Sequence, residues 1–237
     1  MIQFYAPDIE QSGILPETES AHCVRVLRLR EGDNVIVTDG KGHRFECEIK
    51  EAHSIRTSVI IKKRIEVESE RNYRITLAVA PTKNADRIEW LVEKAVELGI
   101  DSFALLKCTH SERKVMKTER LYKLMVSAMK QSLGVRLPEL IELTDFHEFI
   151  SEAPGDSQLY FGYCSSEYPR KDFAKEYTPG RDVLIMIGPE GDFTLEEVEN
   201  AVKAGFVPVT FGEKRLRTET AGVYAVSAVH AINQRLK

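Results

Sequence analysis

From residue 73 onward, short apolar runs alternate with amphipathic stretches, and this alternation limits the fold more than any other feature of the sequence. Val183–Ile187 reads Val-Leu-Ile-Met-Ile, and Gln158–Tyr163 is another short apolar run. Continuous apolar strands are typical of parallel sheets that are covered on both faces. Ala85–Leu98 carries apolar residues at helical spacing and is followed by Gly99, which predicts an amphipathic helix. The pattern predicts an α/β domain in which helices flank a mostly parallel sheet. Further strands are expected at Tyr73–Ala80, Ile100–Leu106 and Val207–Phe211, and a further helix at Glu119–Leu133.

The N-terminal part of the chain has a different pattern, which predicts several short strands and tight turns. Asn34–Thr38 and His43–Ile49 are strand candidates on either side of the turn sequence Asp-Gly-Lys-Gly, and Thr57–Ile65 is a third β-branched run. A short helical segment is expected around Ala21–Leu29. Strands of this kind favour a small β-barrel. With a charged linker at Ile65–Arg71, we expect two domains, residues 1–68 and 72–237.

Composition predicts a soluble cytoplasmic protein. The chain has 237 residues, of which 43% are hydrophobic, so it can fold without disulfide or metal support. Its four cysteines form no CxxC pair and its six histidines form no HExxH motif, so we expect reduced thiols and no metal. The start of the chain lacks the basic and apolar segments of a signal peptide, and no stretch approaches the roughly 20 apolar residues of a membrane span.

Local charge suggests nucleic acid although the net charge is −4. Residues 107–136 carry eight Lys or Arg and two Glu, and residues 22–30 carry three arginines and no acid. Residues 137–170 reverse the sign, with seven acids and one arginine. Phosphate binding depends on where cations gather, so the basic segments indicate an RNA-binding surface. Solvated helix faces are the alternative interpretation.

Two polar segments follow predicted strands, at the position where ligands bind in open α/β sheets. The first reads Gly188-Pro189-Glu190-Gly191-Asp192-Phe193-Thr194 and runs into a helix for which Thr194 and Glu197 predict a capping box. Its glycines permit close approach of backbone to a ligand. An ordinary strand-to-helix turn is the alternative. No Walker sequence occurs, so a triphosphate site is not expected.

The second segment reads Arg215-Leu216-Arg217-Thr218-Glu219-Thr220-Ala221-Gly222 and opens the last helix, with Thr218 or Thr220 as the expected N-cap. It holds more polar groups than capping requires. The helix that follows has small apolar residues nearly all round, which predicts burial on every side. In a final helix this favours a subunit interface, although packing across the sheet would also serve.

Together these segments resemble the RsmE family of SPOUT-class methyltransferases, which methylate uracil N3 in small-subunit ribosomal RNA. The family pattern is approximately GPEGG-F-S/T followed by LRTETA, and the chain matches it at 188–194 and 216–221. The resemblance extends to Lys83–Trp90, Glu93–Gly99 and Ser111–Arg113, and to His22 with Val26–Leu29, Gly32 and Asp33, so that it covers nearly the whole chain. The departures are Asp192 in place of a second glycine, the sequence Phe211–Arg215, and Lys130 in place of a common glutamate.

The resemblance implies a fold, a cofactor and a set of site residues. The fold is a small N-terminal PUA-like β-barrel with a C-terminal SPOUT-type parallel sheet and helices that hold a deep trefoil knot. The implied assembly is a homodimer through the C-terminal domain, and the implied cofactor is S-adenosylmethionine. The positions carried over for the cofactor are Gly188, Glu190, Gly191, Leu216, Thr218 and Thr220, with Gly162 and Tyr163 at an earlier strand end.

Methyl transfer to uracil N3 also requires that the N3 proton leave. The hypothesis is that Arg217 stabilises the developing uracil anion and that Glu219 takes the proton or orients Arg217; a purely structural role for both is the alternative. Ribosomal RNA would be held by His22, Arg25, Arg28, Lys83, Arg87, Lys94, Arg113 and Arg136. Two other functions stay open: a methyltransferase of a different RNA target, and a non-enzymatic RNA-binding assembly factor on the same fold.

Overall fold

The computed structural model describes residues 2–69 and 71–235, which form two compact units. The first comprises residues 1–70 with 126–137, and the second comprises residues 71–125 with 138–237. The expected boundary at 68–72 remains a prediction; residues 126–137 cluster with the N-terminal unit although they follow the boundary in sequence.

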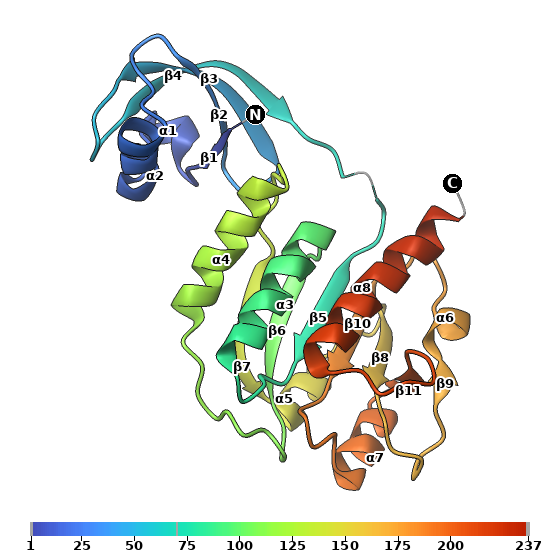
Figure 1. Cartoon of the computed structure of the whole chain (residues 1–237). Helices are drawn as coiled ribbons and strands as arrows, with labels where there is room; N and C mark the ends of the chain where they lie inside the picture. Colours follow the sequence, from blue (N-terminus) through green and yellow to red (C-terminus); the bar gives the residue numbers. More distant parts are fainter. Residues whose placement is uncertain (1, 70, 236–237) are drawn as a thin grey trace. The chain divides into compact units, whose positions relative to one another are not determined.

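The second unit is built on a seven-stranded sheet in which every strand pair is parallel (Figure 1). The strand order is β7-β6-β5-β10-β8-β11-β9. The apolar run Val183–Ile187 is strand β10, and all five of its residues are buried. It pairs with β5 on one side and β8 on the other, which is why it carries no polar residue. The strands span Ile75–Val79 (β5), Ser102–Lys107 (β6), Glu139–Asp145 (β7), Gln158–Gly162 (β8), Lys171–Asp172 (β9), Val183–Ile187 (β10) and Val207–Thr210 (β11).

Helices cover both faces of this sheet. On one face, α3 (Ala85–Leu98) packs beside α8 (Thr218–Gln234), and Gly222 of α8 allows close contact because a Cβ there would lie 2.9 Å from Leu91 and 3.4 Å from Leu77 (Figure 1). On the other face, α5 (Phe146–Ser151) and α7 (Leu195–Lys203) share an apolar core with the sheet. The helix α6 (Phe173–Glu176) also belongs to this unit, whereas α4 (Thr118–Gln131) begins in it and continues into residues 126–131 of the first unit.

The last helix differs from its predicted burial. Ala225, Val226 and Val229 are buried against the rest of the unit, but Tyr224 is 45% exposed and Ala231 is also exposed. Burial on every side is therefore wrong for the chain by itself, because α8 lies at the surface of the unit and has neighbours on one side. None of the described helices is long and apolar enough to cross a membrane.

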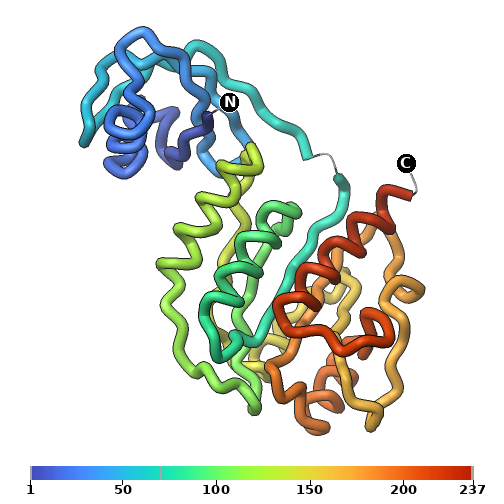
Figure 2. The backbone as a smooth tube through the Cα atoms, viewed as in Figure 1, coloured from blue at the N-terminus to red at the C-terminus, as the bar shows by residue number. Residues whose placement is uncertain are grey.

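The chain reaches α8 by a path that returns across the sheet. After β10 it forms α7 and then β11, which pairs with β8, and from there it returns to α8, which packs on β5 and β10 (Figure 2). The carboxyl ends of β10, β8 and β11 thus lie next to one another at one edge of the sheet.

The first unit contains a four-stranded sheet in the order β1-β2-β3-β4. The chain also pairs with the outer edge of β4, where Leu15 N donates to Thr57 O and Val59 N donates to Gly13 O at 2.9 and 2.8 Å. The buried side chains of this unit form one core that includes Phe4 and Phe45. The strands span Gln3–Tyr5 (β1), Asn34–Thr38 (β2), His43–Glu51 (β3) and Ser58–Glu66 (β4), and the short helices span Ile9–Ser12 (α1) and Glu17–Ala21 (α2).

The helical segment expected at Ala21–Leu29 has a different form. The α-helix α2 ends at Ala21, and His22–Val26 is a π-helical turn. Leu27 N donates to His22 O at 3.0 Å, and Arg28 then takes a left-handed backbone conformation with φ of 57°. Such a residue ends a right-handed helix, so the helix that the sequence predicts does not continue to Leu29.

Candidate active site

A cavity of about 680 Å³ lies at the carboxyl ends of three neighbouring strands of the second unit. Its walls are the loop after β8, the turn after β10 and the loop between β11 and α8. The two segments singled out in the sequence therefore line one cavity. Two bonds join them: Arg215 Nη2 donates to Glu190 O at 3.1 Å, and Thr218 Oγ1 donates to Gly188 O at 3.4 Å.

Two glycines in these walls allow aromatic rings to pack directly against the backbone. A Cβ on Gly162 would lie 2.8 Å from the ring of Phe211, and a Cβ on Gly188 would lie 3.0 Å from the ring of Phe193. Side chains at either position would have to displace an aromatic ring that is packed in place. Both glycines line the cavity, and the lack of a side chain there lets the Phe211 and Phe193 rings pack directly on the backbone that forms its wall.

Asp192 occupies the position where the related pattern has glycine, and the structure explains both choices. Its φ is 63°, in the left-handed region that glycine enters without strain and that Asp tolerates better than most residues. Its carboxylate accepts from Cys164 N at 2.9 Å and from Phe193 N at 3.0 Å. These bonds fix the turn after β10 to the loop after β8.

The helix that follows the turn begins at a capping box, as predicted. Thr194 Oγ1 accepts from Glu197 N, and the Glu197 carboxylate accepts from Thr194 N at 2.8 Å. The other oxygen of Glu197, which is 2% exposed, accepts from Thr109 N at 2.8 Å. Nearby, His110 Nδ1 lies 3.1 Å from Gly191 O and 3.0 Å from Asp192 O. The loop after β6 thus holds the turn from its outer side.

The cavity includes most but not all of the residues expected to bind a cofactor. The lining residues among them are Gly162, Tyr163, Gly188, Glu190, Leu216 and Thr218, while Gly191 and Thr220 lie outside the lining. The expectation that Thr218 or Thr220 is the N-cap is wrong: Arg217 occupies that position, without a side-chain cap bond. Thr218 is the first helical residue, and its hydroxyl is bonded to Gly188 instead.

The two residues expected to act in catalysis differ in burial and in their position relative to the cavity. Arg217 is exposed and lines the cavity. Glu219 is 9% exposed, lies outside the cavity lining, and forms its ion pair with Arg87 at 3.8 Å between Nε and Oε1. Arg87 comes from α3 and does line the cavity.

Several lining residues were not anticipated from the sequence. Arg170 donates to the carbonyl oxygens of Tyr163 and Cys164 and so shapes the loop after β8. Cys164 itself faces the cavity, and burial, with the nearby charge of Asp192, raises the pKa of its thiol. No local sequence pattern marks these residues, because their loop has neither glycine spacing nor a strong turn signal.

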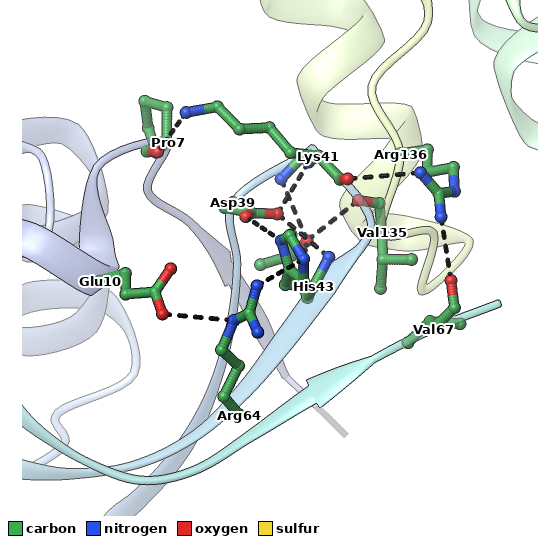
Figure 3. A network of polar contacts seen from close by, with 11 residues as sticks. Pro7, Glu10, Asp39, Lys41, His43, Arg64, Val67, Val135 and Arg136 are labelled. Atoms are coloured by element: carbon green, nitrogen blue, oxygen red, sulfur yellow. Dashed lines mark hydrogen bonds and ion pairs between the residues drawn. The ribbon is translucent and has the colours of Figure 1, made fainter.

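The residues expected to bind RNA differ in their exposure and in the protein contacts that they already make. Arg25 and Arg28 are exposed on the first unit, with Arg25 Nη2 donating to Ser54 Oγ at 3.2 Å, and His22 packs on the ring of Phe4. Arg136 donates to Lys41 O and Val67 O (Figure 3).

In the second unit the expected RNA ligands already have protein partners. Lys83 pairs with Glu112 at 3.0 Å, and Lys94 contacts two carboxylates, those of Glu93 and Glu97. Arg113 donates to the carbonyl oxygens of Thr82 and Lys83. The described residues contain no group of His, Cys, Asp and Glu that could hold a metal ion.

Comparison with known families decides what kind of protein this is. Residues 69–230 match the model of the RNA methyltransferase domain family, and residues 15–63 match the model of the RNA methyltransferase PUA domain. The chain belongs to the RNA methyltransferase family. The cavity described above lies within the methyltransferase domain, and the four-stranded sheet lies within the unit that contains the PUA domain.

Individual members of the family resemble the chain over most of its length. The ribosomal RNA small subunit methyltransferase E of Bacillus subtilis is 28% identical over 222 residues, which cover 89% of this chain and 86% of that protein. A crystal structure described as a "probable rRNA-methyltransferase" from Porphyromonas gingivalis has 41% identity and a TM-score of 0.95, with all of both chains covered. The small subunit methyltransferase E of Neisseria gonorrhoeae, solved with S-adenosylmethionine, has 26% identity and a TM-score of 0.84 and covers 98% of each chain.

Proposed function

We propose that this protein methylates N3 of a uridine in small-subunit ribosomal RNA, with S-adenosylmethionine as the methyl donor, and that it acts in the cytoplasm, where that RNA is assembled. The observation that carries the proposal is the single cavity formed by the 188–194 turn and the 215–221 loop inside a family-matched methyltransferase domain. Relatives that match over most of the chain are named ribosomal RNA small subunit methyltransferase E, and one of them was solved with S-adenosylmethionine bound.

The cavity fits S-adenosylmethionine in size and in surface. Its volume of about 680 Å³ falls within the range of roughly 300–1,000 Å³ that holds small ligands and cofactors. Gly162 and Gly188 contribute backbone to the cavity wall, and Leu216 and Phe211 supply apolar surface. Gly162, Tyr163, Gly188, Glu190, Leu216 and Thr218 would hold the cofactor, and Gly191 and Thr220 would act by shaping the loops. When bound, the sulfonium supplies an activated methyl group.

The chain's own residues then position the base and handle charge. Because the methyl group arrives already activated, much of the rate enhancement comes from orientation of the uracil. Arg217, exposed at the cavity, is proposed to stabilise the negative charge that develops on uracil as N3 loses its proton. An Arg217→Ala variant that binds the cofactor but methylates at the wild-type single-turnover rate would contradict this role.

RNA binding is proposed to depend on the first unit. Arg25 and Arg28 are exposed, and the Arg28 guanidinium forms no hydrogen bond or ion pair with the other described residues. Each lost phosphate contact should reduce the slope of log affinity against log salt by about one. Reversal of both charges (Arg25→Glu with Arg28→Glu) should therefore weaken RNA binding and flatten its salt dependence, and unchanged affinity would remove the first unit from the RNA-binding surface. His22, Lys83, Arg87, Lys94, Arg113 and Arg136 remain further candidates.

Two finer features of the fold belong to the same proposal. A homodimer through α8 is supported by the exposed Tyr224 and Ala231 on a helix that is rich in small apolar residues. A trefoil knot is supported by the path of the chain, which leaves β11 beyond β8 and returns to pack α8 on β5 and β10. In both features α8 is held against other structure, which would fix the 215–221 loop that leads into this helix and lines the cavity.

Two measurements test the function. Calorimetry with S-adenosylmethionine should show binding; no binding would favour the non-enzymatic assembly factor. Mass spectrometry of ribosomal RNA from a deletion strain should show loss of a 3-methyluridine from the small subunit. Loss of a different methylated nucleoside, or loss from transfer RNA, would assign the enzyme to another RNA target.

A further inference from the structure

A buried carboxylate outside the cavity is paired with an arginine inside it. Glu219 lies in the first turn of α8, and its Oε2 is buried without a hydrogen-bond partner among the described residues. A buried acceptor left in this way is costly and calls for an explanation. Glu219 does not line the cavity and its side chain is only 11% exposed, so the carboxylate is poorly placed to take a proton from a base bound there.

The arginine that faces Glu219 has free hydrogen-bonding capacity. Arg87 Nε lies 3.8 Å from Glu219 Oε1, a distance that permits charge attraction but is too long for a hydrogen bond. The Arg87 side chain is 37% exposed and lines the cavity. Its two terminal nitrogens can therefore donate to an oxygen in the cavity while the fixed charge of Glu219 holds the guanidinium from behind.

We propose that Arg87 contacts a carbonyl oxygen of the target uracil and that Glu219 is the residue that positions it. This inference rests on the proposed function. Loss of the N3 proton spreads negative charge onto the two neighbouring carbonyl oxygens, which is the charge that a guanidinium donor stabilises. Arg87 is then a catalytic residue beside Arg217, and Glu219 acts through Arg87 instead of serving as a base.

The geometry favours a base over a phosphate as the partner of Arg87. Arg87 is half-buried at the cavity that would hold the methyl donor, and the base that accepts the methyl group has to lie against that donor. Its nearest protein charge is an acid, so a ligand whose charge develops only during the reaction is matched better than one that arrives fully charged.

The test is single-turnover methylation of small-subunit ribosomal RNA at saturating S-adenosylmethionine over a range of pH. Arg87→Met keeps most of the side-chain packing and should reduce the rate on the order of 10²-fold. Without the cation, the pH at which the rate levels off should rise by about 1–3 units, because an opposite charge at short range lowers a pKa by that amount. The KM for RNA and the calorimetric affinity for the cofactor should stay near wild type, and Arg87→Lys should recover part of the rate.

The Glu219→Gln variant tests whether Glu219 orients Arg87 or only offsets its positive charge. Positioning predicts a slower rate and no further loss when this change is added to Arg87→Met, since the two residues act as one unit. If Glu219 only offset the charge of Arg87, its removal would leave the rate unchanged or raise it, which would overturn the positioning role. Glu119→Gln breaks the exposed ion pair with Lys123 on α4 and serves as the control that should behave as wild type.

Other outcomes overturn the assignment of Arg87. A raised KM and a salt slope smaller by about one, with an unchanged rate at saturation, would make Arg87 a phosphate ligand. Loss of cofactor affinity in Arg87→Met would make it part of the cofactor site. A wild-type protein that binds no S-adenosylmethionine and methylates no uridine would instead refute the proposed function, and the inference with it.

Discussion

Replacement of Asp192 tests whether the turn after β10 depends on backbone conformation or on side-chain bonds. The carboxylate accepts from Cys164 N and Phe193 N, and each such bond contributes about 1 kcal/mol net. The left-handed φ of 63° disfavours alanine against glycine by about 1 kcal/mol. Asp192→Ala loses both bonds and adds the strain that alanine, unlike aspartate, incurs in the left-handed region, so we expect a loss of about 3 kcal/mol in unfolding free energy.

Two further substitutions at the same position separate the contributions. Asp192→Gly loses both bonds but adds no strain, which gives a loss of about 2 kcal/mol. Asp192→Asn keeps one acceptor oxygen and tolerates the left-handed region, so its expected loss is about 1 kcal/mol. The predicted order of stability is therefore Asn above Gly above Ala. Cofactor affinity should follow the same order, since Asp192 and the residues that it fixes line the cavity.

Urea denaturation followed by tryptophan fluorescence measures this order in the relevant unit. Trp90 is the chain's single tryptophan and lies in α3, so its emission reports on the methyltransferase domain separately from the N-terminal unit. Glu167→Ala, at an exposed position on a nearby loop, should change stability by less than about 0.5 kcal/mol. An alanine variant that is as stable as the glycine variant would refute the strain argument.

Three other predictions concern single groups. Glu197→Gln places an amide where the carboxylate accepts from backbone donors in two loops, so unfolding free energy should fall by about 3 kcal/mol in the fluorescence assay, while the exposed neighbour Glu196→Gln should leave it nearly unchanged. Cys164 is the one exposed cysteine of the four, so one thiol should react with alkylating reagents in the native protein. The reaction should be slow at neutral pH, because desolvation by the surrounding loops, with the nearby charge of Asp192, raises the pKa of this thiol. Bound S-adenosylmethionine should protect Cys164, and four equally fast thiols would contradict the fold. Burial, with the charge of Arg71, lowers the pKa of His230, so the unfolded state binds more protons and stability should fall as pH drops below about 6.5; His230→Gln should flatten this dependence, and an unchanged slope would contradict it.

The elements that sequence analysis predicted well are those in which local pattern and burial agree. Ala85–Leu98 is a helix with the predicted bounds and ends at Gly99, whose φ is 88°. Val183–Ile187 is a central strand because an entirely apolar run is stable only with neighbours on both sides. The capping box at Thr194 also depends only on residues within one turn.

Elements that depend on distant contacts were missed or placed wrongly. The N-cap expected at Thr218 or Thr220 is not formed, because the Thr218 hydroxyl bonds to Gly188 in another loop. Arg28 takes a positive φ that its residue type does not predict. The bonds of Arg170 to the loop after β8 likewise follow no local pattern.

The sequence by itself determined many of the strands and helices, because alternation of apolar residues and the chemistry of turns act over a few residues; β7, α5, β9 and α6 were not predicted. Its two polar motifs also carried the resemblance to a methyltransferase family. Only the tertiary structure decided that Glu219 faces Arg87 and that Arg87 lines the cavity, since these residues come from α8 and α3 and meet only when both helices pack on one face of the sheet. Burial and charge pairing arise from that packing, and no periodicity along the chain encodes them.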